Sequence, residues 1–155
     1  MKDRFDAVVP TPIGRVGVVA HHGGISGVVI GVPPTPGTAG SAGRAGAAAL
    51  AAYFEDPQLL PDVELSLGGT EFQQRVWRAL RAIPVGSTRT YGELAEILDT
   101  SPRAVGNACR ANPCPIFVPC HRVVAAQGPG GFAGRRQGRW IDIKRWLLRH
   151  EGAGP

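Results

Sequence analysis

The chain has 155 residues, 43% of them hydrophobic, with 22 glycines and 14 prolines, which fits one compact protein or two small domains rich in turns. No apolar run approaches the roughly 20 residues of a membrane-spanning helix, and the charged N-terminus lacks the apolar stretch of a signal peptide, so we expect a cytoplasmic protein. The net charge of +5 is uneven: residues 1–69 carry 4 Lys/Arg against 6 Asp/Glu (−2), and residues 70–155 carry 13 against 6 (+7), which indicates either a polyanionic partner such as nucleic acid or merely a basic surface.

Strands and one helix are predicted in the N-terminal part. Short β-branched runs punctuated by turns predict strands over residues 6–9, 16–20 and 26–30. A loop rich in Pro, Gly and Ala follows over 32–44, and then an Ala-rich helix over 45–54, which Asp56 and Pro57 end. A further short strand over 63–67 would lead into the second half.

From residue 70 the sequence has helical periodicity. Thr70 and Gln73 form a capping-box pattern, and apolar residues then recur at helical spacing. Thr90 can cap a second helix over 91–98, and Pro102 is a favourable first residue for a third helix that runs to about residue 111. Two short helices joined by a tight turn suggest a helix-turn-helix, a weak signal by itself because such helix pairs are common.

The third predicted helix consists mainly of small residues, with Arg103 and Arg110 near its ends. Small residues let a helix approach another surface closely, and flanking arginines can reach phosphates. The alternative is a helix that packs tightly against another helix of the same protein. The helix alone does not decide between these interpretations.

The three cysteines are Cys109, Cys114 and Cys120, an odd number without a secretion signal, which favours free thiols over a disulfide framework. Together with His121 they could be considered as zinc ligands. Their spacing lacks paired C-x-x-C knuckles, so we expect no metal. Cys109 and Cys114 are interpreted as packed small hydrophobic residues.

Cys120 is the candidate nucleophile. A short buried strand predicted over 116–118 leads to it, and His121 follows it. The thiolate is the reactive form of cysteine, so Cys120 needs a lowered pKa or a nearby base such as imidazole. An acid such as Glu151, at the end of a last helix predicted over 141–151, could orient that base. A purely structural Cys-His pair is the alternative.

Five sequence blocks in the C-terminal part occur in a recognisable order. They are Phe72-Gln73-x-x-Val76-Trp77-x-x-Leu80-x-x-Ile83-Pro84-x-Gly86-x-Thr88-x-Thr90-Tyr91-Gly92-x-Leu94-Ala95, Arg103-Ala104-Val105-Gly106, Arg110-x-Asn112-Pro113-x-Pro115-Ile116, Pro119-Cys120-His121-Arg122-Val123 and Lys144-Arg145-Trp146-Leu147-Leu148-x-x-Glu151. Together they resemble the O6-alkylguanine-DNA alkyltransferases, also called methylated-DNA–protein-cysteine methyltransferases. The resemblance covers about residues 63–152, and the N-terminal part agrees with the family only in general shape.

The resemblance implies a role for each of five catalytic residues. Cys120 matches the alkyl acceptor, and His121 matches the residue that withdraws its proton through a water molecule. Glu151 matches the acid that orients this histidine, and Asn112 matches the asparagine of the family's hinge. Tyr91 matches the tyrosine that assists the departure of guanine.

Binding residues are implied in the same way. The carbonyls of Cys120 and Val123 would accept hydrogen bonds from the guanine amino group, and Phe132 and Ala133 would line the base pocket. Here Phe132 replaces an aromatic residue that often carries a hydroxyl, and Ala133 replaces a frequent serine. The basic loop from Arg135 to Arg139 is longer than usual for the family, and the sequence does not assign it a role.

DNA contacts are implied for the third helix. Arg103 matches the arginine that fills the gap left by a flipped-out base. Ala104 and Gly106 lie where the family's helix enters the minor groove, and Arg110 would lie near phosphates. A damaged base inside stacked DNA cannot be reached without such flipping.

The implied fold is α+β. A small N-terminal domain over 1–62, with an antiparallel sheet and a helix, would be ribonuclease-H-like and structural. A mainly helical domain over 63–155, with a winged helix-turn-helix, would bind DNA and transfer the alkyl group. The substrate would be double-stranded DNA that contains O6-alkylguanine, or also O4-alkylthymine, and transfer to Cys120 would be stoichiometric, by a monomer and without a cofactor.

Two rival functions stay open. A protein that senses alkylated bases without repairing them, like the alkyltransferase-like proteins, would carry another residue in place of Cys120. A Cys-His hydrolase would need an oxyanion hole and would turn over repeatedly.

Overall fold

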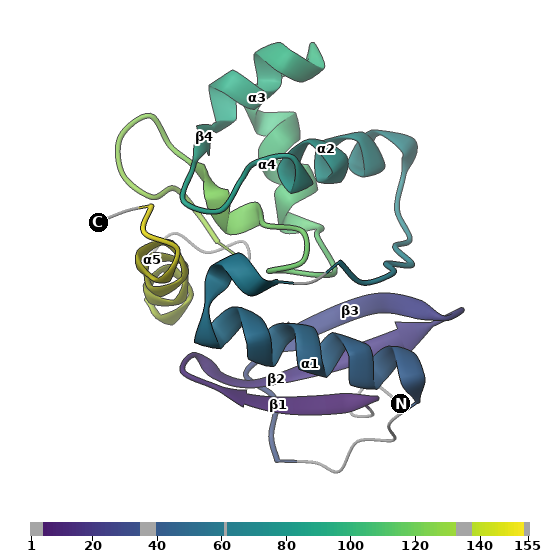
Figure 1. Cartoon of the computed structure of the whole chain (residues 1–155). Coiled ribbons are helices and arrows are strands. Elements are labelled where there is room, and N and C mark those ends of the chain that lie inside the picture. Colours follow the sequence, from purple (N-terminus) through teal and green to yellow (C-terminus); the bar gives the residue numbers. More distant parts are fainter. Residues whose placement is uncertain (1–4, 35–39, 61, 133–137, 154–155) are drawn as a thin grey trace. The chain divides into compact units, whose positions relative to one another are not determined.

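The computed structural model describes residues 5–34, 40–60, 62–132 and 138–153. It is a mixed α+β structure with a small antiparallel sheet and several helices (Figure 1). The chain divides into two compact units, Met1–Gly68 and Gly69–Pro155, which are described separately below. None of the helices in the described ranges combines the length and the apolar character that crossing a bilayer would require.

The first unit contains a three-stranded antiparallel sheet, in the order β1-β2-β3, formed by Ala7–Thr11, Gly14–His21 and Gly24–Ile30. Alternating residues of the central strand β2, such as Val16 and Val18, are completely buried. The predicted strands are therefore present, and each is longer by a few residues at one or both ends because pairing continues up to the tight turns between them.

Helix α1 (Ser41–Glu55) packs on this sheet (Figure 1). It begins at Ser41, inside the segment 32–44 that was predicted to be a loop. The added first turn has a tertiary contact: a side chain on Gly43 would come within 2.8 Å of Asp6, so this glycine allows the start of the helix to pack closely on the chain just before β1. A short 3-10 helix, η1 (Pro57–Leu59), follows α1.

The end of the first unit corrects one predicted element. Residues 63–67 do not form a strand; the segment makes a single parallel bridge between Leu65 and Ile25. The backbone N–H of Ile25 donates to the carbonyl of Glu64 (2.8 Å), and that of Ser66 donates to the carbonyl of Ile25 (2.8 Å). These bonds tie the segment to β3, so the two units divide after Gly68, whereas the predicted domain boundary followed residue 62.

The second unit contains four α-helices among its described residues: α2 (Glu71–Arg81), α3 (Tyr91–Leu98), α4 (Pro102–Arg110) and α5 (Arg139–His150). Complete capping boxes begin α2 and α3, with Thr70 paired to Gln73 and Thr90 paired to Glu93. The Ser101 hydroxyl caps α4. The local start signals therefore account for the beginnings of these three helices.

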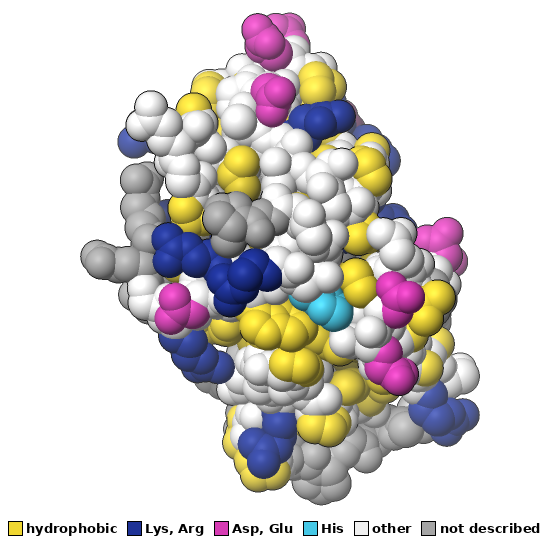
Figure 2. All heavy atoms as spheres, turned by 60° about the vertical axis from the view of Figure 1, so that its left-hand side comes forward, with side chains coloured by type: hydrophobic (Ala, Val, Ile, Leu, Met, Phe, Trp, Pro, Cys, Tyr) yellow, Lys and Arg dark blue, Asp and Glu magenta, His cyan; other side chains and the backbone are white. Residues whose placement is uncertain are grey.

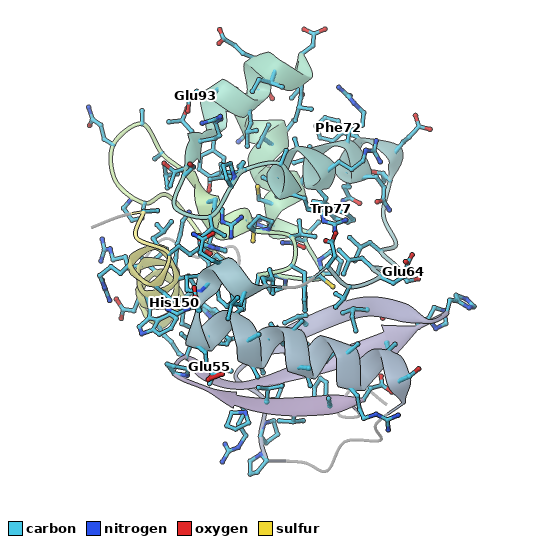
Figure 3. All side chains as sticks on the ribbon, viewed as in Figure 1. Glu55, Glu64, Phe72, Trp77, Glu93 and His150 are labelled. Carbon is cyan, nitrogen blue, oxygen red and sulfur yellow. The ribbon has the colours of Figure 1, made fainter. Side chains whose placement is uncertain are left out.

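Helices α2, α3 and α4 surround a common core. Trp77 of α2 (labelled in Figure 3) is almost completely buried. Its indole N–H donates to the carbonyl of Ala108 on α4 (2.9 Å). Asp99 ends α3 in the left-handed conformation (φ 54°), which aspartate tolerates better than most residues. The turn 99–101 that follows α3 leads directly into α4.

The segment before Cys120 also differs from the prediction. Residues 116–118 do not form a strand, because Ile116 has a positive φ of 79° that is incompatible with extended backbone. The Val118 N–H donates to the carbonyl of Cys114 (2.9 Å), which closes a turn. The short 3-10 helix η2 (Cys120–Arg122) follows, and then β5 (Val123–Val124).

Strand β5 pairs in parallel with β4 (Arg89–Thr90), so that Arg89 lies opposite Val123 and Thr90 opposite Val124. Tyr91 directly follows β4, and Cys120 lies three residues before β5 begins. This short ladder therefore brings two parts of the chain that carry candidate site residues together.

Candidate active site

Cys120 lies on the wall of a cavity of about 790 Å³ in the second unit. Cys120 is only 8% exposed. It nevertheless lines a cavity that is large enough for a small molecule. The cavity is lined by Tyr91, Pro102, Arg103, Gly106, Asn107, Cys109, Arg110, Cys120, Ala125, Gln127, Pro129, Gly130, Gly131, Phe132 and Arg145.

His121 and Glu151, 30 positions apart in sequence, form a buried pair. The Nε2 atom of His121 lies 2.7 Å from Oε2 of Glu151, and both side chains are fully buried. The Arg122 guanidinium also binds this carboxylate: its Nε donates to Oε1 of Glu151 (2.8 Å) and its Nη2 donates to Oε2 (3.0 Å). Arg122 also donates to the carbonyl of Ile83 (2.7 Å), which fixes the guanidinium in place.

The partners of His121 determine its tautomer. A carboxylate held by an arginine can only accept, so Nε2 of the neutral ring carries the proton and donates it to Glu151. Nδ1 then holds a lone pair; it is buried and makes no hydrogen bond to the rest of the described chain. Burial lowers the pKa of His121 despite the opposing effect of Glu151, which keeps the ring neutral near pH 7. Nδ1 of His121 is therefore available as a proton acceptor.

The thiol of Cys120 is not activated by its surroundings alone. Burial raises its pKa, and the hydrogen bond with Asn112 and the charge of Lys144 oppose this effect only in part. Burial also raises the pKa of Cys109 and of Cys114 to about 12. Of the two ways to generate a thiolate, a depressed pKa and an adjacent base, the site therefore offers the base.

Asn112 holds the turn that precedes Cys120. Its side-chain amide donates to the carbonyl of Val118 (2.8 Å), and its Oδ1 accepts from the backbone N–H of Cys114 (2.9 Å). The Asn112 side chain thus bridges the two ends of the turn in which Ile116 has positive φ. A strained backbone persists only where its surroundings hold it, and Asn112 supplies part of that constraint.

Tyr91 and the loop 128–132 form another part of the wall. Gly130 has a φ of 76°, and a side chain there would lie 3.0 Å from the Tyr91 ring, so the loop packs closely on this ring. Phe132 is buried at the end of the loop, and its ring lies 6.4 Å from that of Trp140. Ala133 and residues 135–137 of the basic loop lie outside the described residues.

Helix α4 contributes the charged rim. Arg103 and Arg110 are exposed and line the cavity, as does the half-buried Gly106, whereas Ala104 is half-buried and does not line it. The face drawn in Figure 2 carries Lys and Arg side chains next to one another, with Asp and Glu side chains among them. Because the charge of this face is mixed, it does not by itself indicate a polyanionic ligand. Arg103 and Arg110 of α4, beside the cavity, do indicate one.

Two further residues belong to this site and were singled out by the sequence only as parts of motifs. Arg122 orders Glu151, and Lys144 is a fully buried cation beside Cys120. A lysine between the apolar positions Ile143 and Leu147 of an amphipathic helix is the signal that could have indicated burial. Among the residues that the structure describes, no group of three or more His, Cys, Asp or Glu side chains is arranged to hold a metal ion.

Comparisons with known proteins agree on one family. The family profile "6-O-methylguanine DNA methyltransferase, DNA binding domain" matches residues 71–153. A Methanosarcina acetivorans protein named methylated-DNA–protein-cysteine methyltransferase is 39% identical over 158 residues, which cover 96% of this chain and 99% of that protein. Two crystal structures cover 96% of this chain and 93% of theirs: Mycobacterium tuberculosis O6-methylguanine methyltransferase (34% identity, TM-score 0.76) and Mycobacterium tuberculosis OGT in complex with DNA (35%, 0.74).

Proposed function

The chain belongs to the 6-O-methylguanine DNA methyltransferase family, and we propose that it repairs DNA by moving an alkyl group from O6 of guanine, or from O4 of thymine, to the sulfur of Cys120. The observation that carries this proposal is the pairing of Nε2 of His121 with Glu151 next to a cysteine that lines a cavity. This pairing leaves Nδ1 of His121 as a proton acceptor one residue away from the sulfur.

The reaction is a substitution at carbon. His121 accepts the proton of Cys120 through a water molecule, and the thiolate attacks the alkyl carbon. The S–C bond forms as the C–O bond to guanine breaks, and the electron pair of that bond leaves with the base. The imidazolium that forms on His121 is stabilised by Glu151, whose charge is held in place by Arg122.

The departing base needs a proton and an oriented pocket. We assign the proton donation to Tyr91, which lines the cavity with Cys120. The carbonyls of Cys120 and Val123 accept from the guanine amino group, while Phe132 and Ala133 flank the base. The purine leaves in neutral form, so no further reactant is needed to balance the step.

Helices α3 and α4 serve as a helix-turn-helix of the winged type, with α4 as the helix that enters the minor groove. Its small residues, including Ala104 and Gly106, permit a close approach, and minor-groove contacts suit a repair protein because they encode sequence poorly. Arg103 enters the duplex in place of the flipped base, and Arg110 binds phosphate.

The product determines the stoichiometry. A thioether on Cys120 has no good leaving group, so each molecule acts once, as a monomer and without a cofactor. The first unit, whose sheet and helix we compare to the ribonuclease-H fold, has a structural role. We place the protein in the cytoplasm, where thiols stay reduced.

The decisive experiment is mass spectrometry after incubation with duplex DNA that contains one O6-methylguanine. Wild-type protein should gain one methyl group per molecule and no more with excess DNA. Tryptic cleavage yields residues 111–122, a peptide with both Cys114 and Cys120, so fragmentation must place the methyl group on Cys120. Cys120→Ala protein should bind the same DNA but gain no mass.

The outcomes separate the rival functions. Binding without transfer by wild-type protein would indicate a damage sensor. A Cys-His hydrolase would neither bind the DNA stably nor take up a methyl group, and it would turn over ester or amide substrates repeatedly. Methyl transfer that persists in Cys120→Ala would refute the assignment of the acceptor.

A further inference from the structure

Lys144 is a buried cation that donates to two backbone carbonyls, one of which belongs to the cavity-lining residue Gly131. It lies on α5, is fully buried, and is flanked on that helix by the buried residue Ile143 and the exposed residue Arg145. Its ammonium group donates to the carbonyl of Val123 (2.6 Å) and to the carbonyl of Gly131 (2.8 Å). A buried charge is costly unless it is paired or hydrogen-bonded. Here two carbonyl groups hold it, and among the residues that the structure describes no carboxylate lies at salt-bridge distance from it.

The two carbonyls belong to opposite parts of the site. Val123 begins β5, directly after the 3-10 helix that carries Cys120, whereas Gly131 lies in the loop that packs on Tyr91. The ammonium nitrogen also lies 6.0 Å from the centre of the Tyr91 ring. Lys144 thus connects the strand after the nucleophile with the loop that closes the cavity.

We propose that Lys144 is a positioning residue for the damaged base: it holds the Val123 carbonyl and the loop at Gly131 in the geometry that receives a purine opposite Cys120. This inference rests on the proposed function and adds the residue that shapes its pocket. A charge-assisted hydrogen bond is shorter and stronger than a neutral one, so the ammonium group orients each carbonyl firmly. The second lone pair of the Val123 carbonyl stays available to a ligand.

The ammonium form is present at neutral pH. Burial lowers the pKa of Lys144 to about 8, against the opposing influence of the Cys120 and Cys109 thiols. The other titratable groups near it are Tyr91, whose ring it faces, and His121, whose pKa is lowered in part by the charge of Lys144. Lys144 itself is fully buried and does not line the cavity, whereas Arg103, Arg110 and Arg145 do.

The test compares wild-type protein with Lys144→Met, which fills a similar volume without donors, and Lys144→Gln, which keeps an amide donor. The free base O6-benzylguanine is the probe, because its use removes contacts to the DNA backbone. The concentration of O6-benzylguanine that gives half of the limiting rate and the limiting rate of Cys120 alkylation are measured separately. The rate of reaction with iodoacetamide reports the intrinsic reactivity of the thiol. Arg149→Met, an exposed cation on the same helix, is the matched control.

We expect Lys144→Met to raise the half-saturating concentration about tenfold, which corresponds to roughly 1.4 kcal/mol, while the limiting rate and the iodoacetamide reaction change less than threefold. Lys144→Gln should recover part of the loss, and Arg149→Met should behave as wild type. An unchanged half-saturating concentration in Lys144→Met would overturn the proposal. So would a loss confined to the limiting rate and to iodoacetamide reactivity, because Lys144 would then act on the thiolate. Failure of wild-type protein to take up a methyl group from duplex DNA that contains O6-methylguanine would instead refute the proposed function.

Discussion

At Cys120 two requirements oppose each other, because a buried thiol resists ionisation whereas alkyl transfer needs the thiolate. The site places a base, His121, next to Cys120 in the sequence and does not keep the sulfur permanently ionised. His121 is kept neutral by burial and held in one tautomer by Glu151, which is in turn fixed by two hydrogen bonds from Arg122. The thiolate therefore forms by proton transfer to His121, although burial favours the thiol.

The burial of neutral His121 predicts a pH-dependent stability. Its pKa in the folded protein is lowered from the ordinary value of 6.5, so below pH 6.5 the unfolded chain takes up a proton that the folded chain does not. The free energy of unfolding should fall as the pH decreases through this range. Urea denaturation at pH 7.5 and pH 5.0 should show a smaller decrease for His121→Gln than for wild-type protein.

His21→Gln is the control for this measurement, since His21 is exposed at the β2–β3 turn of the first unit. This variant should keep the full decrease of the wild-type protein. An equal decrease in wild-type and His121→Gln proteins would show that the histidine does not have to stay neutral in the folded state.

Among the elements, α4 combines features that would be unfavourable in a core helix. Its buried side consists of Val105 and Ala108, while Arg103 and Arg110 are exposed beside the cavity. The Ser101 cap and Pro102 at the first position fix its start, so the position of Arg103 in the first turn follows from local sequence. A short helix that is fixed at its N-terminus can present an arginine at a defined place.

Replacement of Arg103 should separate base flipping from chemistry. Arg103→Ala should slow methyl transfer from duplex DNA roughly tenfold or more, because the few kcal/mol needed to extrude a base are no longer offset. Alkylation by a free O6-alkylguanine base should change little, since no duplex has to be opened. Rates on both substrates are measured by quenched-time mass spectrometry.

Arg78→Ala provides the matched loss of an exposed positive charge, on α2 instead of α4. It should have a much smaller effect on duplex repair. Equal slowing of Arg103→Ala on duplex and on free base would remove the insertion role and would point to a direct contribution to the pocket.

At the scale of the whole molecule, charge and chemistry lie in the same unit. The cavity, the His121–Glu151 pair and the excess of basic residues all belong to residues 70–155, with 13 Lys/Arg against 6 Asp/Glu, whereas residues 1–69 are slightly acidic. The first unit has its own core around Val16, Val18, Leu50 and Tyr53. This division predicts that DNA affinity depends on the charge of the second unit.

That dependence can be measured as a salt effect. Binding to duplex DNA, followed by fluorescence anisotropy, should weaken linearly in a plot of log affinity against log salt concentration. Arg110→Ala should make the slope shallower by about one unit, as expected for the loss of one phosphate contact. Arg15→Ala, an exposed arginine on β2 of the first unit, should leave the slope unchanged. The same slope in Arg110→Ala and wild-type proteins would contradict a phosphate contact at Arg110.

Much of the second unit was predictable because its signals are local. Capping boxes at Thr70 and Thr90 and the proline at 102 defined where α2, α3 and α4 begin, since a cap acts within one turn of the helix. The sequence around Cys120 was also sufficient to indicate the family. The start of α1 and the segment 116–118 were predicted wrongly, because the close packing of a helix glycine and a positive φ at Ile116 depend on contacts that periodicity does not contain.

By itself, the sequence determined the helices, the candidate nucleophile and the excess of positive charge around it, because propensity, caps and net charge are properties of short segments. Only the tertiary structure decided that Nε2 of His121 is the atom bound to Glu151, that Arg122 shares this carboxylate, and that Lys144 joins Val123 to Gly131. These contacts close over 13 to 30 positions of the chain, and which atoms meet across such a distance is set by the packing of the whole unit around its core.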